Sequence, residues 1–442
     1  MEKTIKSKVL SIVLMLTLFV SMTPMLTGEA FAVESTVEIL KANGEAATSG
    51  SDYSYEAGVY SIISDNLVIT TEGPEAATAS FVIPGTVKHI TLKDCNIKGL
   101  DNKDVFNAAN VGSGAQAADQ NDLKVSIIGN CTLKNGANDG SQSTMYFHCY
   151  NNHSVTISGA RGSNLYVESL EGNGLCVSHE YSSKANELLT LTDYASIQLR
   201  RTTSTENDKA PLSIAGAFLM DCAAKIDAQQ FGGYSALAIV GDVTLKDTAY
   251  MHCESPETAI DMNNDGDHNL SVLDDASLTA KGGKYTTVCL WGEALFDTTG
   301  TVEIDNAYDS ALRCKIFKVK NKEGKIILRA NGEKLTDGSS ALQLTDKDNY
   351  YLGKTVNMYG SSDKDADEKA VTTKLGDYWA VETPSDYVFY HPYVGPNTPA
   401  RTILIKGVST QDEIDKVNTT DNININKILF LFKIKPPYKL NL

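Results

Sequence analysis

Cysteine is scarce in this sequence, and its spacing matches no ligand motif. Eight cysteines and seven histidines are spread over 442 residues. They form no C-x-x-C pair and no zinc-type spacing, so we expect neither a metal nor a cofactor. Cys95, Cys131 and Cys222 fall at or beside bends of a repeat described below. We expect all three to be small apolar side chains stacked inside a core.

Positive charge is also in short supply. The chain has 39 lysines and arginines against 55 aspartates and glutamates, which gives a formal net charge of −16. An acidic surface repels the phosphate backbone of nucleic acids and the headgroups of anionic lipids. The composition therefore argues against nucleic acid as a partner and against adhesion to an anionic membrane.

Long hydrophobic runs are missing after the N-terminal segment, so we expect no integral membrane segment in the mature chain. Three lysines within the first eight residues precede an apolar run over 9–20, and a small-x-small motif ends at Ala32. This pattern predicts a signal peptide over 1–32, cleaved near Ala32. The apolar run is too short to be a membrane span. We therefore expect a secreted or cell-surface protein.

Helical periodicity is absent from the central region, where alternating apolar and polar residues repeat instead. "GDVTLKDTAYMHCES" at 241–255 and "HNLSVLDDASLTAKG" at 268–282 share this pattern, with an Asp-x-Ala bend in "DTA" and "DDA". Period-two alternation is typical of strands. The bends are 26 residues (221 to 247) to 35 residues (94 to 129) apart. They are anchored at Asp94, Gly129, Gly159, Asp193, Asp221, Asp247, Asp274 and, less regularly, Asp305.

One repeat cannot bury its own apolar face, but stacked repeats can, about 4.8 Å apart. The sequence therefore predicts an all-β parallel β-helix with terminal caps. We expect an N-terminal cap and first coils over 33–80, the helix over 81–320, and last coils or a small β module over 321–408. The segment 409–442 is predicted to be a poorly ordered tail; a membrane or wall anchor is the alternative. One interior column should contain the residues two positions before the bends: Leu92, Ile127, Ile157, Leu191, Leu245 and Val272.

The repeated V-T-L-x-D-x-A-x-L coil, behind a Gram-positive-style signal peptide, resembles a known group of proteins. These are the secreted right-handed parallel β-helices of Firmicutes, some of them labelled as carbohydrate-binding-domain-containing, with the fold of pectate lyases. The resemblance covers about residues 55–320. It implies a right-handed β-helix and a surface location. It transfers no catalytic residue, because the motif describes a coil and not a site.

Catalytic motifs of the enzymes with this fold are missing as well. The sequence contains no Asn-Thr-Asp, Gly-His-Gly or Arg-Ile-Lys triplet. Asp274 and Asp275 are adjacent, so in a strand they point to opposite faces. A column of Asp193, Asp221, Asp247 and Asp274 would have a spacing close to that of a retaining glycosidase pair. Aspartate at a bend also satisfies backbone N–H groups locally, and we expect that structural role.

A partial calcium motif occurs in "DMNNDGDHN". Asp261, Asn263, Asp265 and Gly266 match the start of a D-x-N-x-D-G loop, but Val272 stands where an EF-hand needs glutamate. A polar turn between strands explains the same residues. We therefore expect little or no calcium binding.

The candidate ligand site is a run of alternating aromatic residues. In "STMYFHCYNN" we expect Met145, Phe147 and Cys149 to point inward. Tyr146, His148 and Tyr150 would then line the outside, and Trp291 in "TTVCLWGE" is also predicted to point outward. Exposed aromatic side chains in a row often mark binding sites, and they suit the C–H face of a sugar ring. The alternative is that a neighbouring loop covers these rings.

We therefore predict a secreted or cell-surface β-helical protein that binds carbohydrate, a polysaccharide or other glycan, without catalysis. One alternative is a polysaccharide lyase or glycoside hydrolase on the same fold. Another is a structural stalk that holds a further domain away from the cell wall. The lack of a catalytic constellation favours binding over the enzyme.

Overall fold

The computed structural model describes residues 35–407 with internal gaps. The gaps are 112–121, 137–139, 141, 151–152, 180–186, 204–207, 263–265, 321–322, 331–338, 346–349 and 354–355, with further short stretches between 364 and 397. The expected signal peptide and the expected tail lie outside the described residues, and both stay predictions.

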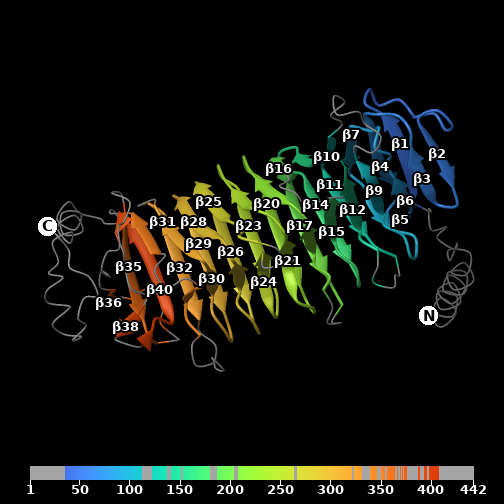
Figure 1. Cartoon of the computed structure of the whole chain (residues 1–442). Helices are drawn as coiled ribbons and strands as arrows, with labels where there is room; N and C mark the ends of the chain where they lie inside the picture. The colour runs from blue at the N-terminus through green and yellow to red at the C-terminus, as the bar shows by residue number, and fades with distance from the viewer. Residues whose placement is uncertain are drawn as a thin grey trace, which may run out of the picture.

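The alternating runs form short strands that wind into a parallel β-helix, as predicted. Each coil contributes three strands, such as β7 (His89–Lys93), β8 (Asn96–Lys98) and β9 (Phe106–Val111). The next coil repeats the order, and its first strand, β10 (Leu123–Ile128), pairs in parallel with β7. Figure 1 shows the chain colour advancing steadily along one axis, as stacked coils require.

Three long sheets result, which we number in the order in which each coil visits them. Sheet 1 has 13 strands: β1 (Thr36–Lys41), β4 (Leu67–Glu72), β7, β10, β13 (Val155–Gly159), β16 (Glu187–Asp193), β19 (Ala217–Met220), β22 (Val243–Leu245), β25 (Leu270–Asp274), β28 (Glu293–Thr298), β31 (Ile316–Val319), β34 (Tyr350–Gly353) and β37 (Tyr387–Val388). Sheet 2 also has 13 strands: β5 (Ala77–Thr78), β8, β11 (Asn130–Lys134), β14 (Asn164–Ser169), β17 (Ser196–Arg201), β20 (Lys225–Gln230), β23 (Tyr250–Glu254), β26 (Ser277–Gly282), β29 (Thr301–Asn306), β32 (Lys325–Ala330), β40 (Thr402–Gly407), β35 (Val356–Ser361) and β36 (Thr373–Lys374). Sheet 3 has 12 strands: β2 (Tyr53–Glu56), β3 (Val59–Ile62), β6 (Ser80–Val82), β9, β12 (Met145–Cys149), β15 (Leu175–His179), β18 (Leu212–Ile214), β21 (Ser235–Ile239), β24 (Thr258–Met262), β27 (Val288–Leu290), β30 (Leu312–Cys314) and β33 (Leu342–Leu344).

Antiparallel strands close both ends of the stack. At the N-terminal end β1 pairs antiparallel with β4, and β2 with β3. At the C-terminal end β40 lies antiparallel between β32 and β35, and β37 pairs antiparallel with β34. A separate two-stranded pair is formed by β38 (Tyr393–Gly395) and β39 (Thr398–Pro399). Among the described residues there is no helix long and apolar enough to cross a membrane.

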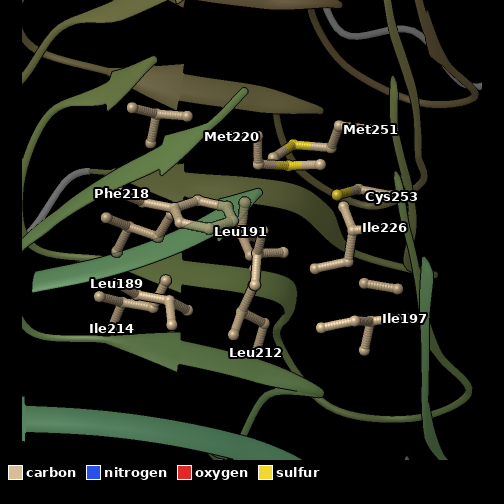
Figure 2. Close-up of a cluster of buried hydrophobic side chains, with 14 of the residues drawn as sticks. Leu189, Leu191, Ile197, Leu212, Ile214, Phe218, Met220, Ile226, Met251 and Cys253 are labelled. Atoms are coloured by element: carbon tan, nitrogen blue, oxygen red, sulfur yellow. The ribbon is translucent and has the colours of Figure 1, made fainter. Parts of the chain in front are cut away.

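The inward side chains of the three sheets form one continuous core. Figure 2 shows residues from successive coils lying in layers: Leu189, Leu191, Ile197, Leu212, Ile214, Phe218, Met220, Ile226, Met251 and Cys253. All ten are at most 2% exposed. Each coil therefore buries its apolar face only because its neighbours cover it, as expected for a solenoid.

The predicted interior column is divided into two. All six of its residues are buried. Leu92 is aligned with Ile127, but Ile127 is aligned with Gly159 and not with Ile157. Ile157 is instead aligned with Val125, in a column that continues through Leu191, Met220, Leu245 and Val272. The expectation of one column was therefore wrong: between Ile127 and Ile157 the alignment is shifted by two residues.

The cause is the length of one bend. Only Gly129, with φ +69°, joins β10 to β11, whereas residues 160–163 join β13 to β14. The longer bend lets the sheet 2 strands keep their stacking (Asn130 with Asn164), while the sheet 1 strands pair two residues out of the expected alignment. A bend that takes up extra residues shifts register without disturbing the core.

The cysteine prediction holds for two of its three residues. Cys95, just before β8, and Cys131, on β11, are buried in neighbouring coils, but Cys222 is exposed at a bend with φ +55°. All eight cysteines are described, and all are free thiols. The mistake at Cys222 arises because the preceding residue, Asp221, was taken as the bend residue.

Candidate functional site

The aromatic stripe, which we define as Tyr146, His148 and Tyr150, lies on the outer face of sheet 3. Along β12 the inward residues are buried, and Tyr146 and His148 are half-buried. Tyr150 follows the strand and is also half-buried. The expected alternation is therefore present. The rings are not fully open to solvent, which makes the stripe a shallower platform than the sequence implied.

Hydrogen bonds and ring contacts hold the stripe in place. Ser178 lies on the adjacent strand β15, and its hydroxyl is 2.8 Å from Nδ1 of His148. The same hydroxyl is 3.3 Å from the Tyr146 hydroxyl. The rings of His148 and Tyr150 meet edge to face at 4.8 Å. Burial and the neighbouring His148 lower the pKa of His179, so that imidazole favours its neutral form. The stripe is thus fixed in place, and its hydroxyl and imidazole groups can donate and accept hydrogen bonds.

Trp291 is exposed as expected, but the structure does not bring it to the stripe. It follows β27, which lies five strands along sheet 3 from β12, or about 24 Å at the usual strand spacing. Its indole is 36% exposed and carries the Arg313 guanidinium 4.6 Å from the ring centroid. A single ligand would need to be long to touch both places.

The aspartates at the bends have a structural role, as predicted, but they act between coils. Asp247 Oδ2 accepts the Cys222 backbone N–H at 2.9 Å, and Asp274 Oδ2 accepts that of Asp247 at 3.1 Å. These two bonds cross from one coil to the next and do not close an Asx-turn. Asp247 and Asp274 also have φ near +55°, a conformation that aspartate tolerates better than most residues. Their carboxylates are therefore committed to the fold.

Two possible metal sites have little support. Ligand atoms of Asp221, Cys222 and Asp247 lie within 4.8 Å of one another, but Asp247 already accepts a backbone N–H and Asp221 lies 3.8 Å from the Lys246 ammonium. For calcium, Asp261 lies on β24 with its side chain 5% exposed. Asn263 and Asp265 fall outside the described residues, so that prediction stays untested.

The outer face of sheet 2 is charged, a feature that the sequence analysis did not detect. Arg200 pairs with Asp227 at 2.5 Å. His252 lies between two acids, with Nδ1 3.1 Å from Asp227 and Nε2 3.9 Å from Glu254. Arg200, Asp227 and His252 come from three neighbouring coils, so the stacking register brings them together, whereas Glu254 lies on the same strand as His252.

A second aromatic group was also missed. We define the aromatic corner as Phe231, Tyr234, Tyr285 and Tyr308, which lie in the connections between sheets 2 and 3. Their exposed fractions are 59%, 38%, 41% and 45%, and they are four of the eight aromatic side chains exposed among the described residues. The sequence signal is an aromatic residue beside the turn that precedes the third strand of a coil, in "FGGY", "GGKY" and "NAYD".

The comparisons with known proteins assign no family. No protein-family model matches the sequence, and neither the curated proteins nor the solved structures that were searched contain a match. The chain is identified by its architecture alone, as a parallel β-helix whose exposed aromatic side chains are concentrated along sheet 3 and the corner that leads into it.

Proposed function

We propose that this protein is a secreted or cell-surface carbohydrate-binding protein without catalytic activity. The observation that carries the proposal is the distribution of aromatic side chains. Both stripe tyrosines, Trp291 and the whole aromatic corner lie on sheet 3 or at its edge. The resemblance to secreted β-helices of Firmicutes supports the same function.

The physical reason is that a sugar ring presents an apolar C–H face and a rim of hydroxyl groups. An aromatic ring covers the first, and tyrosine, serine and imidazole groups bond to the second. A β-helix holds these groups on strands that are paired on both sides, so little conformational entropy is lost when a ligand binds. Rigid elements of this kind suit recognition of a repetitive polymer.

The test is retention of the purified protein on a panel of immobilised polysaccharides, with release of reducing ends measured in parallel. We expect retention without release. In the double variant Tyr146→Ala/Tyr150→Ala we expect about a tenfold loss of affinity for each ring that the ligand contacts. Tyr194→Ala, at an exposed bend between sheets 1 and 2, is the matched control and should bind normally. Failure of the wild type to bind any polysaccharide would contradict the proposal.

A second candidate function is a polysaccharide lyase or hydrolase. The observation in its favour is His252 between Asp227 and Glu254, since an imidazole beside carboxylates can transfer protons. Against it, Asp227 is paired with Arg200. If the wild type releases reducing ends and His252→Ala does not, the protein is an enzyme and the proposal of binding without catalysis is wrong. A protein that neither binds nor cleaves any polysaccharide would favour the stalk.

A further inference from the structure

The aromatic corner is built from equivalent positions of successive coils. In sheet 3, Leu237, Ile260, Val288 and Leu312 are aligned strand by strand. Tyr234, Glu257 and Tyr285 each lie three residues before one of these positions, and Tyr308 lies four before the last. The aromatic side chains are therefore displaced from one another along the axis of the helix.

Two rings of the aromatic corner are in contact and form one continuous surface. The centroids of Tyr234 and Tyr285 are 5.7 Å apart, although a whole coil lies between their backbones. That coil contributes Glu257, whose side chain is only 13% exposed. Glu257 pairs with Lys284 at 2.9 Å, and the Lys284 ammonium lies 5.0 Å from the Tyr285 ring centroid. The two rings thus meet across the coil of Glu257, and the negative charge of Glu257 is balanced by Lys284.

Hydrogen bonds between coils fix the connections that carry the rings. The carbonyl of Tyr234 accepts the backbone N–H of Thr258 at 3.0 Å and the Ser255 hydroxyl at 3.3 Å. Buried Asn306 donates to the Tyr285 carbonyl at 2.5 Å and accepts the Tyr308 N–H at 2.6 Å. A surface fixed in this way is ready to bind without reorganising.

Short connections keep this corner open. The aromatic connections cover only 231–234, 283–287 and 307–311, and the one between the first two covers 255–257. The connections on either side of this set are longer, over 202–211 and 331–341. The exposed rings therefore lie where four successive connections of this corner are short.

We propose that the aromatic corner binds a neutral, linear polysaccharide lying parallel to the axis of the β-helix. From the coil of Tyr234 to that of Tyr308 is three coil rises, or roughly 14 Å, which requires an extended ligand. A polyanion is disfavoured by the net charge of −16 and by the neutralised Glu257–Lys284 pair. An extended peptide cannot add to the sheet edge here, because the strands at this corner are paired on both sides. The inference rests on the proposed function and adds the polymer class and its direction.

The experiment compares two double variants of the full protein, Tyr234→Ala/Tyr285→Ala and the matched control Tyr194→Ala/Tyr250→Ala. The control tyrosines are 49% and 36% exposed but lie on other faces. The probes are cello-, xylo- and manno-oligosaccharides of increasing length, polygalacturonate, and phosphatidylcholine vesicles. Affinity is measured by calorimetry, and folding is checked by circular dichroism.

We expect the protein to bind one of the neutral oligosaccharide series. Its affinity should rise with the length of the oligosaccharide until the oligosaccharide spans the aromatic corner. The corner variant should lose about tenfold or more in affinity, and the control should lose none. Equal losses in both variants, unchanged binding by the corner variant, or a preference for polygalacturonate or vesicles would overturn the inference. Loss in Tyr146→Ala/Tyr150→Ala alone would also overturn it while leaving the proposed function standing. No binding of any saccharide by the wild type would overturn both.

Discussion

At the scale of single residues, one of the largest fully buried side chains is an arginine. Arg201 ends β17 and is fully buried. Its Nη1 donates to the Gly232 carbonyl at 2.7 Å, and Nη2 and Nε donate to the Glu171 carbonyl at 3.0 and 3.2 Å. The guanidinium therefore joins the coils before and after its own, at the same corner that carries the aromatic rings.

We predict that Arg201→Met lowers the free energy of unfolding by about 2–4 kcal/mol, because each buried acceptor left without a donor costs roughly 1–3 kcal/mol. Chemical denaturation followed by circular dichroism measures the change. Arg161→Met, at an exposed bend position, is the control and should shift stability by less than about 0.5 kcal/mol. A loss in Arg201→Met no greater than in this control would mean that the arginine does not join the coils.

A tyrosine on sheet 2 makes stability depend on pH in the alkaline range. The Tyr166 hydroxyl donates to Glu168 Oε2 at 2.7 Å. Burial, and then the Glu168 carboxylate, raise the pKa of Tyr166 to about 12. In the unfolded chain the tyrosine pKa is about 10. The unfolded state therefore loses the proton first, and the stability contributed by this group falls between about pH 10 and pH 12.

The variant Tyr166→Phe removes this ionisation. We predict that its stability relative to the wild type improves as pH rises from about 10 to 12, whatever the difference at neutral pH. Denaturation midpoints at pH 9 and at pH 11.5 give the comparison. Parallel pH profiles for the two proteins would show that Tyr166 ionises as readily in the fold as in the unfolded chain.

At the scale of elements, the bend between sheets 1 and 2 sets how coils stack. Positive φ occurs in this bend at Gly73, Asp94, Gly129, Gly162, Asp193, Cys222, Asp247 and Asp274. An aspartate at such a position can accept the backbone N–H of the bend residue in the preceding coil. Asp247 does so for Cys222, and Asp274 does so for Asp247. The bend thus demands a backbone that tolerates positive φ, and aspartate there also supplies an acceptor.

We predict a graded response at Asp274. Asp274→Asn keeps an acceptor and tolerates the left-handed conformation, so its cost should be smallest. Asp274→Gly loses only the acceptor, and Asp274→Ala should lose about 1–2 kcal/mol more than the glycine variant because alanine is strained at φ +55°. Thermal unfolding of the three proteins gives the order. An alanine variant as stable as the glycine variant would show that backbone strain has no part in this choice.

At the scale of the whole molecule, the protein is one stacked core containing unpaired thiols. Five of the eight cysteines are buried, two are half-buried, and Cys222 is exposed. Burial raises the pKa of Cys149 to about 12 and that of Cys289 to about 11. Because the thiolate is the reactive form, these side chains should be inert in the native protein.

We predict that one thiol reacts quickly with a disulfide reagent at pH 8, and that all eight react once the protein is unfolded. Cys222→Ser should abolish the fast phase. Fewer than eight thiols after unfolding would instead reveal a disulfide.

Much of the fold could be predicted because the information is local. Alternation along "MYFHCY" is sufficient to place Phe147 inside and Tyr146 outside, whatever lies in the next coil. The candidate site was harder. Trp291 was identified as exposed, but its separation from Tyr146 depends on how many strands lie between them. Tyr234 and Tyr285 are 51 residues apart (234 to 285), and nothing local shows that their rings meet.

The sequence by itself determined that this chain forms strands, that the strands stack, and which side chains face the core, because periodicity and repetition act within one coil. Only the tertiary structure decided which residues of different coils become neighbours. The longer bend after β13 moved Ile157 two positions out of the column of Ile127. The same stacking brought Asp227 beside His252 and set Tyr234 against Tyr285. The register between coils depends on the lengths of all the bends and connections together. The sequence of a single repeat therefore does not determine it.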